Sequence, residues 1–247
     1  FLCKENKYQL LTLKHQYSNN TLPEIELVDM KECYQKQEVY GIFTKTLYDA
    51  INQALSNKKQ VIIFQNRRGY APHLQCNVCG YVPNCPNCDV SLTFHKENHD
   101  MECHYCGYHT ETISYCPDCH SHSLKTVGIA TEKIEEELGN YFPKARITRM
   151  DLDSTRTKEA YKKIINDFEN QRIDILVGTQ IISKGLDFNN VSLVGVLDAD
   201  SLLHYPDFRS YERAYQLLTQ VSGRSGKRKQ KGRVIIQTFE PRHRVLT

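Results

Sequence analysis

The sequence predicts an α/β protein, with a parallel-sheet domain interrupted by a small double zinc-ribbon insertion. Strand-length apolar segments alternate with helix-length amphipathic segments along most of the chain. This alternation is typical of a parallel sheet with helices on both faces. Eight of the ten cysteines form four Cys-x-x-Cys pairs within one short stretch, which indicates paired metal-binding knuckles.

Before the cysteine-rich stretch, the pattern predicts a strand at Ile25–Met30, a helix at Thr44–Ser56 and a strand at Gln60–Gln65. The helix is predicted because apolar residues recur at helical spacing, with Thr46 and Asp49 as a capping pair. The second strand is short and almost entirely apolar, as expected of a buried position in a parallel sheet.

After the cysteine-rich stretch, the alternation resumes. The predicted helices are one that Thr131 caps and that runs to about Asn140, one at Thr155–Asn170 and one at Phe208–Val221. The Thr155–Asn170 helix carries one apolar face, formed by Tyr161, Ile164, Ile165 and Phe168. The predicted strands are Ala145–Met150, Ile173–Gly178, Val191–Leu197 and Arg233–Phe239.

The cysteine-rich segment lies between a strand and the next helix, so we interpret residues 71–125 as an insertion. The α/β domain is then discontinuous and comprises residues 25–70 and 126–247. A hydrophobic content of 40% is sufficient for a core, and a net charge of +3 does not by itself indicate nucleic acid binding. No apolar stretch approaches the length of a transmembrane helix.

The four pairs are Cys76/Cys79, Cys85/Cys88, Cys103/Cys106 and Cys116/Cys119. Each pair supplies half of a tetrahedral thiolate site, so four pairs make two Cys₄ sites suited to Zn²⁺. A disulfide framework is disfavoured because nothing at residues 1–20 resembles a signal peptide. An iron–sulfur site is the weaker alternative, and the seven nearby histidines are interpreted as surface residues.

The spacing between pairs indicates which of them share a metal. Only five residues separate Cys79 from Cys85, whereas fourteen separate Cys88 from Cys103. The longer segment alternates apolar and polar residues and contains a polar turn, which predicts a β-hairpin. The inner site is therefore predicted to use Cys85, Cys88, Cys103 and Cys106, and the outer site Cys76, Cys79, Cys116 and Cys119. Sequential pairing is the alternative.

Ligands collect at the carboxyl ends of parallel strands, so the loops there are the expected functional segments. Two such loops are distinctive, Asn66–Pro72 and Gly178–Phe188. A third segment, Gln220–Lys227, leads into the last strand.

These three segments resemble motifs IV, V and VI of superfamily 2 helicases. The order NRRGYAP, four cysteine pairs, GTQ-x₃-KG-x₂-F and Q-x₂-GR-x-G resembles the PriA family of replication-restart helicases (primosomal protein N′). The segments Ala130–Leu138 and Asp207–Arg209 also resemble this family, and the resemblance covers nearly the whole chain. In that family the pairing of the cysteines is nested, in agreement with the spacing.

The resemblance implies a RecA-like second helicase lobe, with residues 1–24 as a linker from the first lobe. It implies an ATP-dependent 3′-to-5′ DNA helicase that uses ATP and Mg²⁺, recognises stalled forks, D-loops and single strands, and initiates primosome assembly. The implied partners are DNA, primosome proteins and single-stranded DNA-binding protein, with no membrane. The implied location is the bacterial cytoplasm, at the nucleoid.

The resemblance also assigns site residues, motif by motif. In motif VI, Arg224 is expected to contact the ATP phosphates, with Gln220 and Gly223 beside it. The family pattern ends in a second arginine where this chain has Lys227, so Arg228 is an alternative for that position. In motifs IV and V, Gly185 and Asp187 are expected at the nucleotide, and the residues expected at the DNA are Arg67, Arg68, Thr179, Gln180 and Lys184.

The sequence contains neither a Gly-x₄-Gly-Lys-Ser/Thr phosphate loop nor an Asp-Glu-x-His run. Both belong to the first helicase lobe, so the chain alone is expected to be catalytically inactive. Two alternatives are a zinc-ribbon DNA-binding module on an α/β scaffold, and a protein-docking module on the same scaffold.

Overall fold

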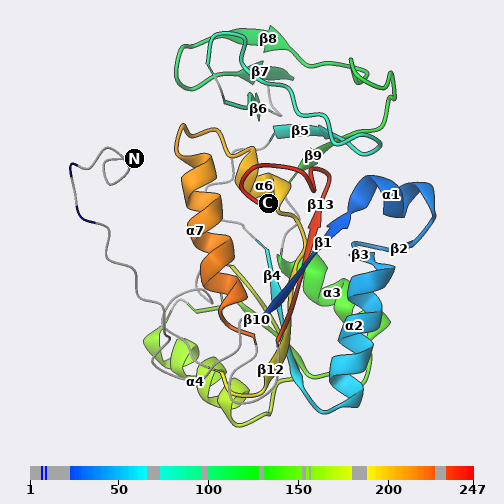
Figure 1. Cartoon of the computed structure of the whole chain (residues 1–247), viewed down its shortest axis with the longest axis vertical. Helices are drawn as coiled ribbons and strands as arrows, with labels where there is room; N and C mark the ends of the chain where they lie inside the picture. Colours follow the sequence, from blue (N-terminus) through cyan, green and yellow to red (C-terminus); the bar gives the residue numbers. More distant parts are fainter. Residues whose placement is uncertain are drawn as a thin grey trace.

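The computed structural model describes residues 7, 9, 23–65, 73–88, 90–95, 99–127, 131–151, 154–155, 157–179, 188–225 and 232–247. Its centre is a six-stranded sheet in the order β1-β13-β12-β4-β11-β10, in which every pairing is parallel (Figure 1). The strands are β1 (Glu24–Asp29), β4 (Gln60–Phe64), β10 (Ile147–Met150), β11 (Ile175–Gly178), β12 (Val191–Val196) and β13 (Arg233–Thr238). The predicted parallel sheet is confirmed, and each of these strands lies within three residues of its predicted bounds.

Helices cover both faces of the sheet. On one face lie α2 (Lys45–Ser56) and α3 (Thr131–Tyr141), and on the other lie α4 (Lys158–Glu169), α6 (Asp200–Leu203) and α7 (Ser210–Ser222). Successive side chains of a strand point to opposite faces, and β4 shows this directly. Ile62 and Phe64 pack in the core beneath α4 and α7, whereas Val61 and Ile63 pack beneath α2 and α3.

The helix starts differ from the predictions in ways that the local hydrogen bonds explain. Thr44, and not Thr46, is the N-cap of α2, because its Oγ1 accepts the backbone N–H of Leu47 at 3.4 Å. Thr157 caps α4 in the same way, so this helix begins three residues later than predicted. Thr131 is the first residue of α3, and its hydroxyl donates to Asp151 at 2.6 Å.

Among the described residues of the lobe, four short elements were not predicted from the sequence. They are α1 (Met30–Gln35), the antiparallel pair β2 (Val39–Tyr40) and β3 (Phe43–Thr44), and α6. Each is six residues or shorter, so a period of 2 or 3.6 has no room to become visible. Phe208, the predicted first residue of α7, lies outside that helix, which begins at Ser210.

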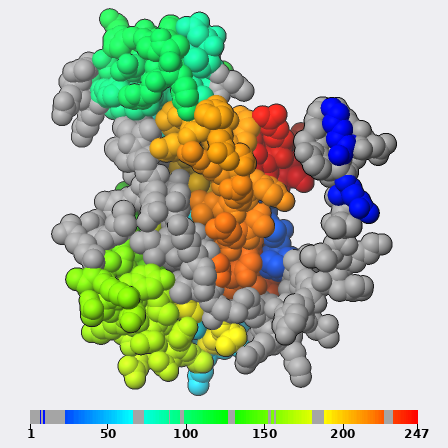
Figure 2. Space-filling model, turned by 90° about the vertical axis from the view of Figure 1, so that its left-hand side faces the viewer, coloured from blue at the N-terminus to red at the C-terminus, as the bar shows by residue number. Residues whose placement is uncertain are grey.

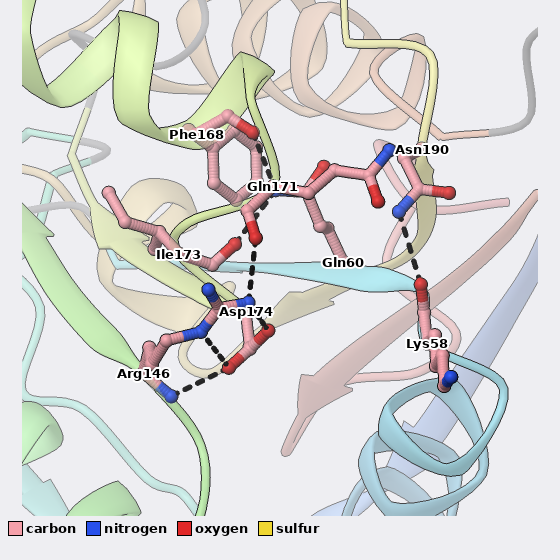
Figure 3. A network of polar contacts seen from close by, with 8 residues as sticks. All are labelled: Lys58, Gln60, Arg146, Phe168, Gln171, Ile173, Asp174 and Asn190. Atoms are coloured by element: carbon pink, nitrogen blue, oxygen red, sulfur yellow. Dashed lines mark hydrogen bonds and ion pairs between the residues drawn. The ribbon is translucent and has the colours of Figure 1, made fainter.

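Polar side chains join the elements at the amino edge of the sheet (Figure 3). The buried Gln60 Nε2 donates to the carbonyl oxygens of Phe168 at 2.7 Å and Ile173 at 2.8 Å, so it holds the carboxyl end of α4 against β4. Arg146 donates to both carboxylate oxygens of Asp174, at 2.6 and 2.9 Å. These hydrogen bonds lower the pKa of Asp174.

The cysteine-rich segment leaves the sheet through an antiparallel stem, β5 (His73–Cys76) paired with β9 (Leu124–Val127). Above the stem lies a three-stranded sheet of β6 (Thr93–His95), β7 (Asp100–Glu102) and β8 (His109–Glu111), and its β6–β7 pair confirms the predicted hairpin. The segment sits over the end of the lobe where β4 stops (Figure 1). None of the helices among the described residues has the length and apolar character needed to cross a bilayer.

Candidate functional site

Eight cysteine sulfurs of the insertion form two clusters. One contains Cys76, Cys79, Cys116 and Cys119, and the other contains Cys85, Cys88, Cys103 and Cys106, with all ligand atoms of a cluster within 4.8 Å of one another. The sulfurs are therefore grouped in the nested arrangement and not in the sequential one. The β6–β7 hairpin lies between the second and third pairs, so it brings the inner four cysteines together.

The sulfur positions fit a tetrahedral metal ion. Sγ–Sγ distances are 3.5 Å for Cys76–Cys119, 3.5 Å for Cys79–Cys116 and 3.6 Å for Cys85–Cys106. Four Zn–S bonds of about 2.3 Å in a tetrahedron place the sulfurs about 3.8 Å apart. A disulfide requires an S–S distance of about 2.05 Å, so these sulfurs are not bonded to one another.

Backbone groups shape each knuckle around its sulfurs. The N–H groups of Val78 and Asn87 donate to the first sulfur of their knuckles, each at 3.4 Å. Gly80 and Gly107, which follow the second cysteine, have φ of +79° and +71°, and these values turn the chain back over the pair. His120 takes the same position after Cys119 at φ +57°, without the freedom of a glycine.

Backbone N–H groups favour the thiolate form of one cysteine in each cluster. Burial opposes the ionisation of Cys76, but hydrogen bonds from the N–H groups of Cys79 and Val78 outweigh it and lower the pKa of Cys76 to about 7. A hydrogen bond from the Tyr108 N–H lowers the pKa of Cys106 to about 7. Burial raises the pKa of Cys79 and Cys85, and the neighbouring sulfurs raise that of Cys88. Negative charge among four sulfurs favours a divalent cation between them.

The histidines of the insertion belong to neither four-cysteine group among the described residues. His109 pairs with Asp100 at 2.7 Å and is exposed, as predicted for a surface residue. His73 is an exception to that interpretation: it is 4% exposed and lies in the stem strand β5. Its burial follows from the placement of the stem between the lobe and the metal clusters.

A third group of metal-ligand types, Asp200, His204 and Glu240, lies where β12 and β13 end. Its polar atoms are already engaged within the protein. The two carboxylate oxygens of Asp200 accept from the Thr238 hydroxyl and the Phe239 N–H, each at 2.9 Å, and His204 Nε2 lies 2.7 Å from a Glu240 oxygen. This group therefore fastens the ends of β12 and β13 together, and sequence reasoning missed it. The available signal was the pair of acidic residues, Asp198 and Asp200, that follows the apolar strand.

The motif residues are placed as follows. Thr179 is buried directly after β11, at the carboxyl edge of the sheet. Gln220 is exposed in the last turn of α7, Gly223 is its C-cap, and Arg224 follows, half-buried, with its N–H donating to Val221 O at 3.0 Å. Because α7 runs toward the amino ends of the strands, the structure does not bring Thr179 together with these three residues (Figure 1). The other expected site residues lie outside the described part of the chain: Arg67, Arg68, Gln180, Lys184, Gly185, Asp187 and Lys227.

Two family models match the chain. The model of the PriA DNA helicase Cys-rich region domain matches residues 85–110, which hold the inner cysteine cluster. The model of the helicase conserved C-terminal domain matches residues 109–229, which include the segments resembling motifs V and VI. The first match lies within the insertion. The second begins near the end of the insertion and extends through most of the second part of the lobe.

Curated relatives align with almost the whole chain. Replication restart protein PriA of Bacillus subtilis is 46% identical over 96% of this chain and 29% of its own length, and that of Rickettsia conorii is 42% identical over 98% and 37%. The chain thus spans about a third of the length of these relatives. Among solved structures, RecG bound to a three-way DNA junction aligns at 12% identity and a TM-score of 0.46, over 91% of this chain and 19% of that one. With both family models and the curated relatives in agreement, the chain belongs to the PriA family of replication restart proteins.

Proposed function

We propose that the chain is the second motor lobe and zinc-binding insertion of an ATP-dependent 3′-to-5′ DNA helicase. The whole protein would recognise stalled forks and D-loops and initiate primosome assembly. The observation that supports this best is the pair of nested four-cysteine clusters at the carboxyl edge of a parallel sheet in a chain that carries motifs V and VI. The same proposal includes the division of the chain. Residues 1–24 are the linker, residues 25–70 and 126–247 form the lobe, and residues 71–125 form the insertion.

Two Zn²⁺ ions would bind the two four-cysteine groups and fix the fold of the insertion. The insertion has only a small core of its own, in which the described buried members are Leu74, Cys85, Val90, Leu92, Phe94, Met101 and Cys103. A unit with so small a core depends on metal for its folding. The role of the zinc is therefore structural. The stem, β5 paired with β9, connects the insertion to the lobe.

Arg224 would contact the phosphates of ATP held by the first lobe of the full-length protein. A guanidinium group at this point stabilises the charge that develops on the transferred γ-phosphoryl group. Gln220, Gly223 and Lys227 would shape the same segment, and Gly185 and Asp187 would approach the nucleotide from motif V. The chain carries no phosphate loop of its own, so ATP and Mg²⁺ are bound only in the full-length protein.

DNA would lie along the carboxyl edge of the sheet, where Thr179 follows β11. The contacts would be to phosphates, made by Arg67, Arg68, Thr179, Gln180 and Lys184, because a motor that moves along DNA cannot depend on base sequence. Primosome proteins and single-stranded DNA-binding protein are the proposed protein partners.

The decisive experiment is an ATPase assay of the full-length protein with and without single-stranded DNA. Arg224→Ala should lower turnover by about two orders of magnitude or more while DNA affinity is retained. Arg172→Ala is the matched control, since Arg172 is an exposed arginine paired with Asp167. DNA-stimulated turnover unchanged by Arg224→Ala would contradict the assignment of motif VI.

A salt series of DNA binding separates the motor from a protein-docking module. Phosphate contacts make affinity fall steeply as salt rises, and Lys184→Ala should make the slope shallower by about one unit. Salt-insensitive or absent binding would favour the docking alternative.

A further inference from the structure

Phe208 is the most exposed large hydrophobic residue among the described residues, at 77% exposure. It lies in the Asp207-Phe208-Arg209 segment, between α6 and α7, and packs in none of the three hydrophobic cores. Contiguous exposed apolar surface marks a binding site more often than a scattered surface residue does, so the neighbours of Phe208 decide its significance.

The backbone that carries Phe208 is held rigidly. The N–H of Arg209 donates to Asp207 Oδ1 at 2.7 Å, and the N–H of Ser210 donates to the Asp207 carbonyl at 2.9 Å. The guanidinium group of Arg213 binds the second carboxylate oxygen of Asp207. Asp207 therefore ties the backbone that follows Phe208 to the start of α7.

The ring of Tyr105 stands beside that of Phe208, although it comes from the insertion, between Cys103 and Cys106 of the inner cluster. The ring centroids are 6.4 Å apart with an interplanar angle of 82°, and the Tyr105 hydroxyl accepts the Phe208 N–H at 3.3 Å. Tyr105 is itself 51% exposed. Figure 2 shows the insertion directly above the start of α7. The two rings are in contact and both are exposed, so they form one aromatic surface between the insertion and the lobe.

The chemistry of this surface suits a nucleobase. It offers flat ring faces, and its charges are already paired within the protein: Arg209 with Glu212, and Arg213 with Asp207. Such a surface has little attraction for phosphate and gains its binding energy from stacking. It also lies at the end of the lobe where Thr179 follows β11 and the insertion is seated.

We propose that Phe208, supported edge-on by Tyr105, is a stacking platform for one base of single-stranded DNA at the junction of insertion and lobe. The inference rests on the proposed function and adds a base contact to the phosphate contacts named there. Stacking tolerates every base, so the platform is compatible with movement along any sequence.

The test compares the binding of the full-length protein to oligo-dT and to an abasic oligonucleotide of equal length. The wild-type protein should prefer oligo-dT. Phe208→Ala should weaken oligo-dT binding by roughly 5- to 100-fold, the range that stacking of one base contributes, with little effect on the abasic strand. Phe208→Trp should restore the preference. Tyr215→Ala is the matched control, because Tyr215 is an exposed aromatic residue of α7 at 61% exposure.

Tyr105→Phe tests whether Tyr105 acts only by joining the insertion to the lobe. It keeps the ring and removes the hydroxyl that accepts the Phe208 N–H. The preference for bases should survive this change. Equal weakening of both oligonucleotides by Phe208→Ala, or loss of the preference in Tyr105→Phe, would overturn the platform. Salt-sensitive binding without any preference for bases would overturn this inference alone. No binding of either strand would overturn the proposed function as well.

Discussion

Gly80 of the insertion lies against Phe239 of the lobe so closely that a Cβ at Gly80 would stand 2.5 Å from the Cβ of Phe239. Phe239 directly follows β13 and also lies 5.6 Å beneath Lys125 Nζ from the stem. On the lobe side, Tyr34 of α1 stacks on Phe239 with ring centroids 6.0 Å apart. Phe239 is thus the lobe residue against which the Cys76/Cys79 knuckle of the outer cluster packs.

Gly80→Ala should destabilise this contact. A methyl group there must displace Phe239, and alanine also disfavours the φ of +79°. Together these effects should lower the free energy of unfolding by about 2 to 4 kcal/mol, measured by denaturant titration of the zinc-loaded protein. Gly107→Ala is the control, since Gly107 has φ +71° but a Cβ would meet nothing within 4 Å. Equal losses in the two variants would show that backbone strain alone is responsible.

Gln60→Leu should destabilise the lobe without affecting the insertion. The substitution removes the amide donor to the carbonyl oxygens of Phe168 and Ile173 (Figure 3). The Phe168 oxygen keeps the N–H of Gln171 at 3.0 Å, so the cost falls mainly on the Ile173 carbonyl. We expect a loss of about 2 to 4 kcal/mol in the free energy of unfolding, with zinc content unchanged. Lys59→Met is the control, because Lys59 also bonds at this edge, through Asn190, but is partly exposed. Equal losses from the two changes would contradict the assignment of the cost to buried carbonyls.

The sheet and its main helices could be predicted because their periodicities extend over four or more residues. The buried run of β4 and the apolar face of α4 identified a doubly covered sheet, and the cysteine spacing identified the nested clusters. The short elements α1 and α6 and the burial of His73 could not be predicted. They depend on what the folded chain places beside them, and a local pattern carries no information about that.

The contacts between the insertion and the lobe could not be predicted from the sequence either. Tyr105 and Phe208 are 103 residues apart, and Gly80 and Phe239 are further apart still. A glycine after a knuckle can be explained by its turn alone, but the second role of Gly80 as the space for Phe239 follows only from tertiary packing.

Zinc analysis should give two ions per chain, one for each four-cysteine group. Cys85→Ser should lose the inner ion and unfold the β6–β7 hairpin, because this cluster holds much of the small core of the insertion. Cys33→Ser is the control, since Cys33 is a buried cysteine of α1 outside both groups and its loss should leave two ions bound. Elemental analysis and amide hydrogen exchange measure the two effects. A single ion in the wild-type protein would refute the paired-site assignment.

Stability should fall as pH rises through neutrality because of His204. Burial opposes the charge of His204, but the hydrogen bond and charge of Glu240, together with Asp200 and Asp198, outweigh it and raise the pKa of His204. A raised folded-state pKa contributes stability that is complete below the unfolded value of about 6.5 and is lost as pH rises through the folded value. The free energy of unfolding should therefore decline from about pH 6 upward, and His204→Gln should reduce this decline.

Two carboxyl groups beside His204 also change the stability with pH, and they do so mainly at lower pH than the histidine. Burial raises the pKa of Asp200 to about 6, so its contribution has the same sign but is largely lost by the pH at which His204 begins to titrate. The hydrogen bond from His204 lowers the pKa of Glu240, so the stability from this group is lost only at acidic pH. Burial also raises the pKa of Asp198, and its contribution has the same sign as that of His204. Denaturant unfolding of His204→Gln and Asp198→Asn at several pH values above about 6 therefore separates the two groups. His122→Gln, a change at an exposed histidine of the insertion, should leave the decline intact. An equal decline in His204→Gln would assign it to another group.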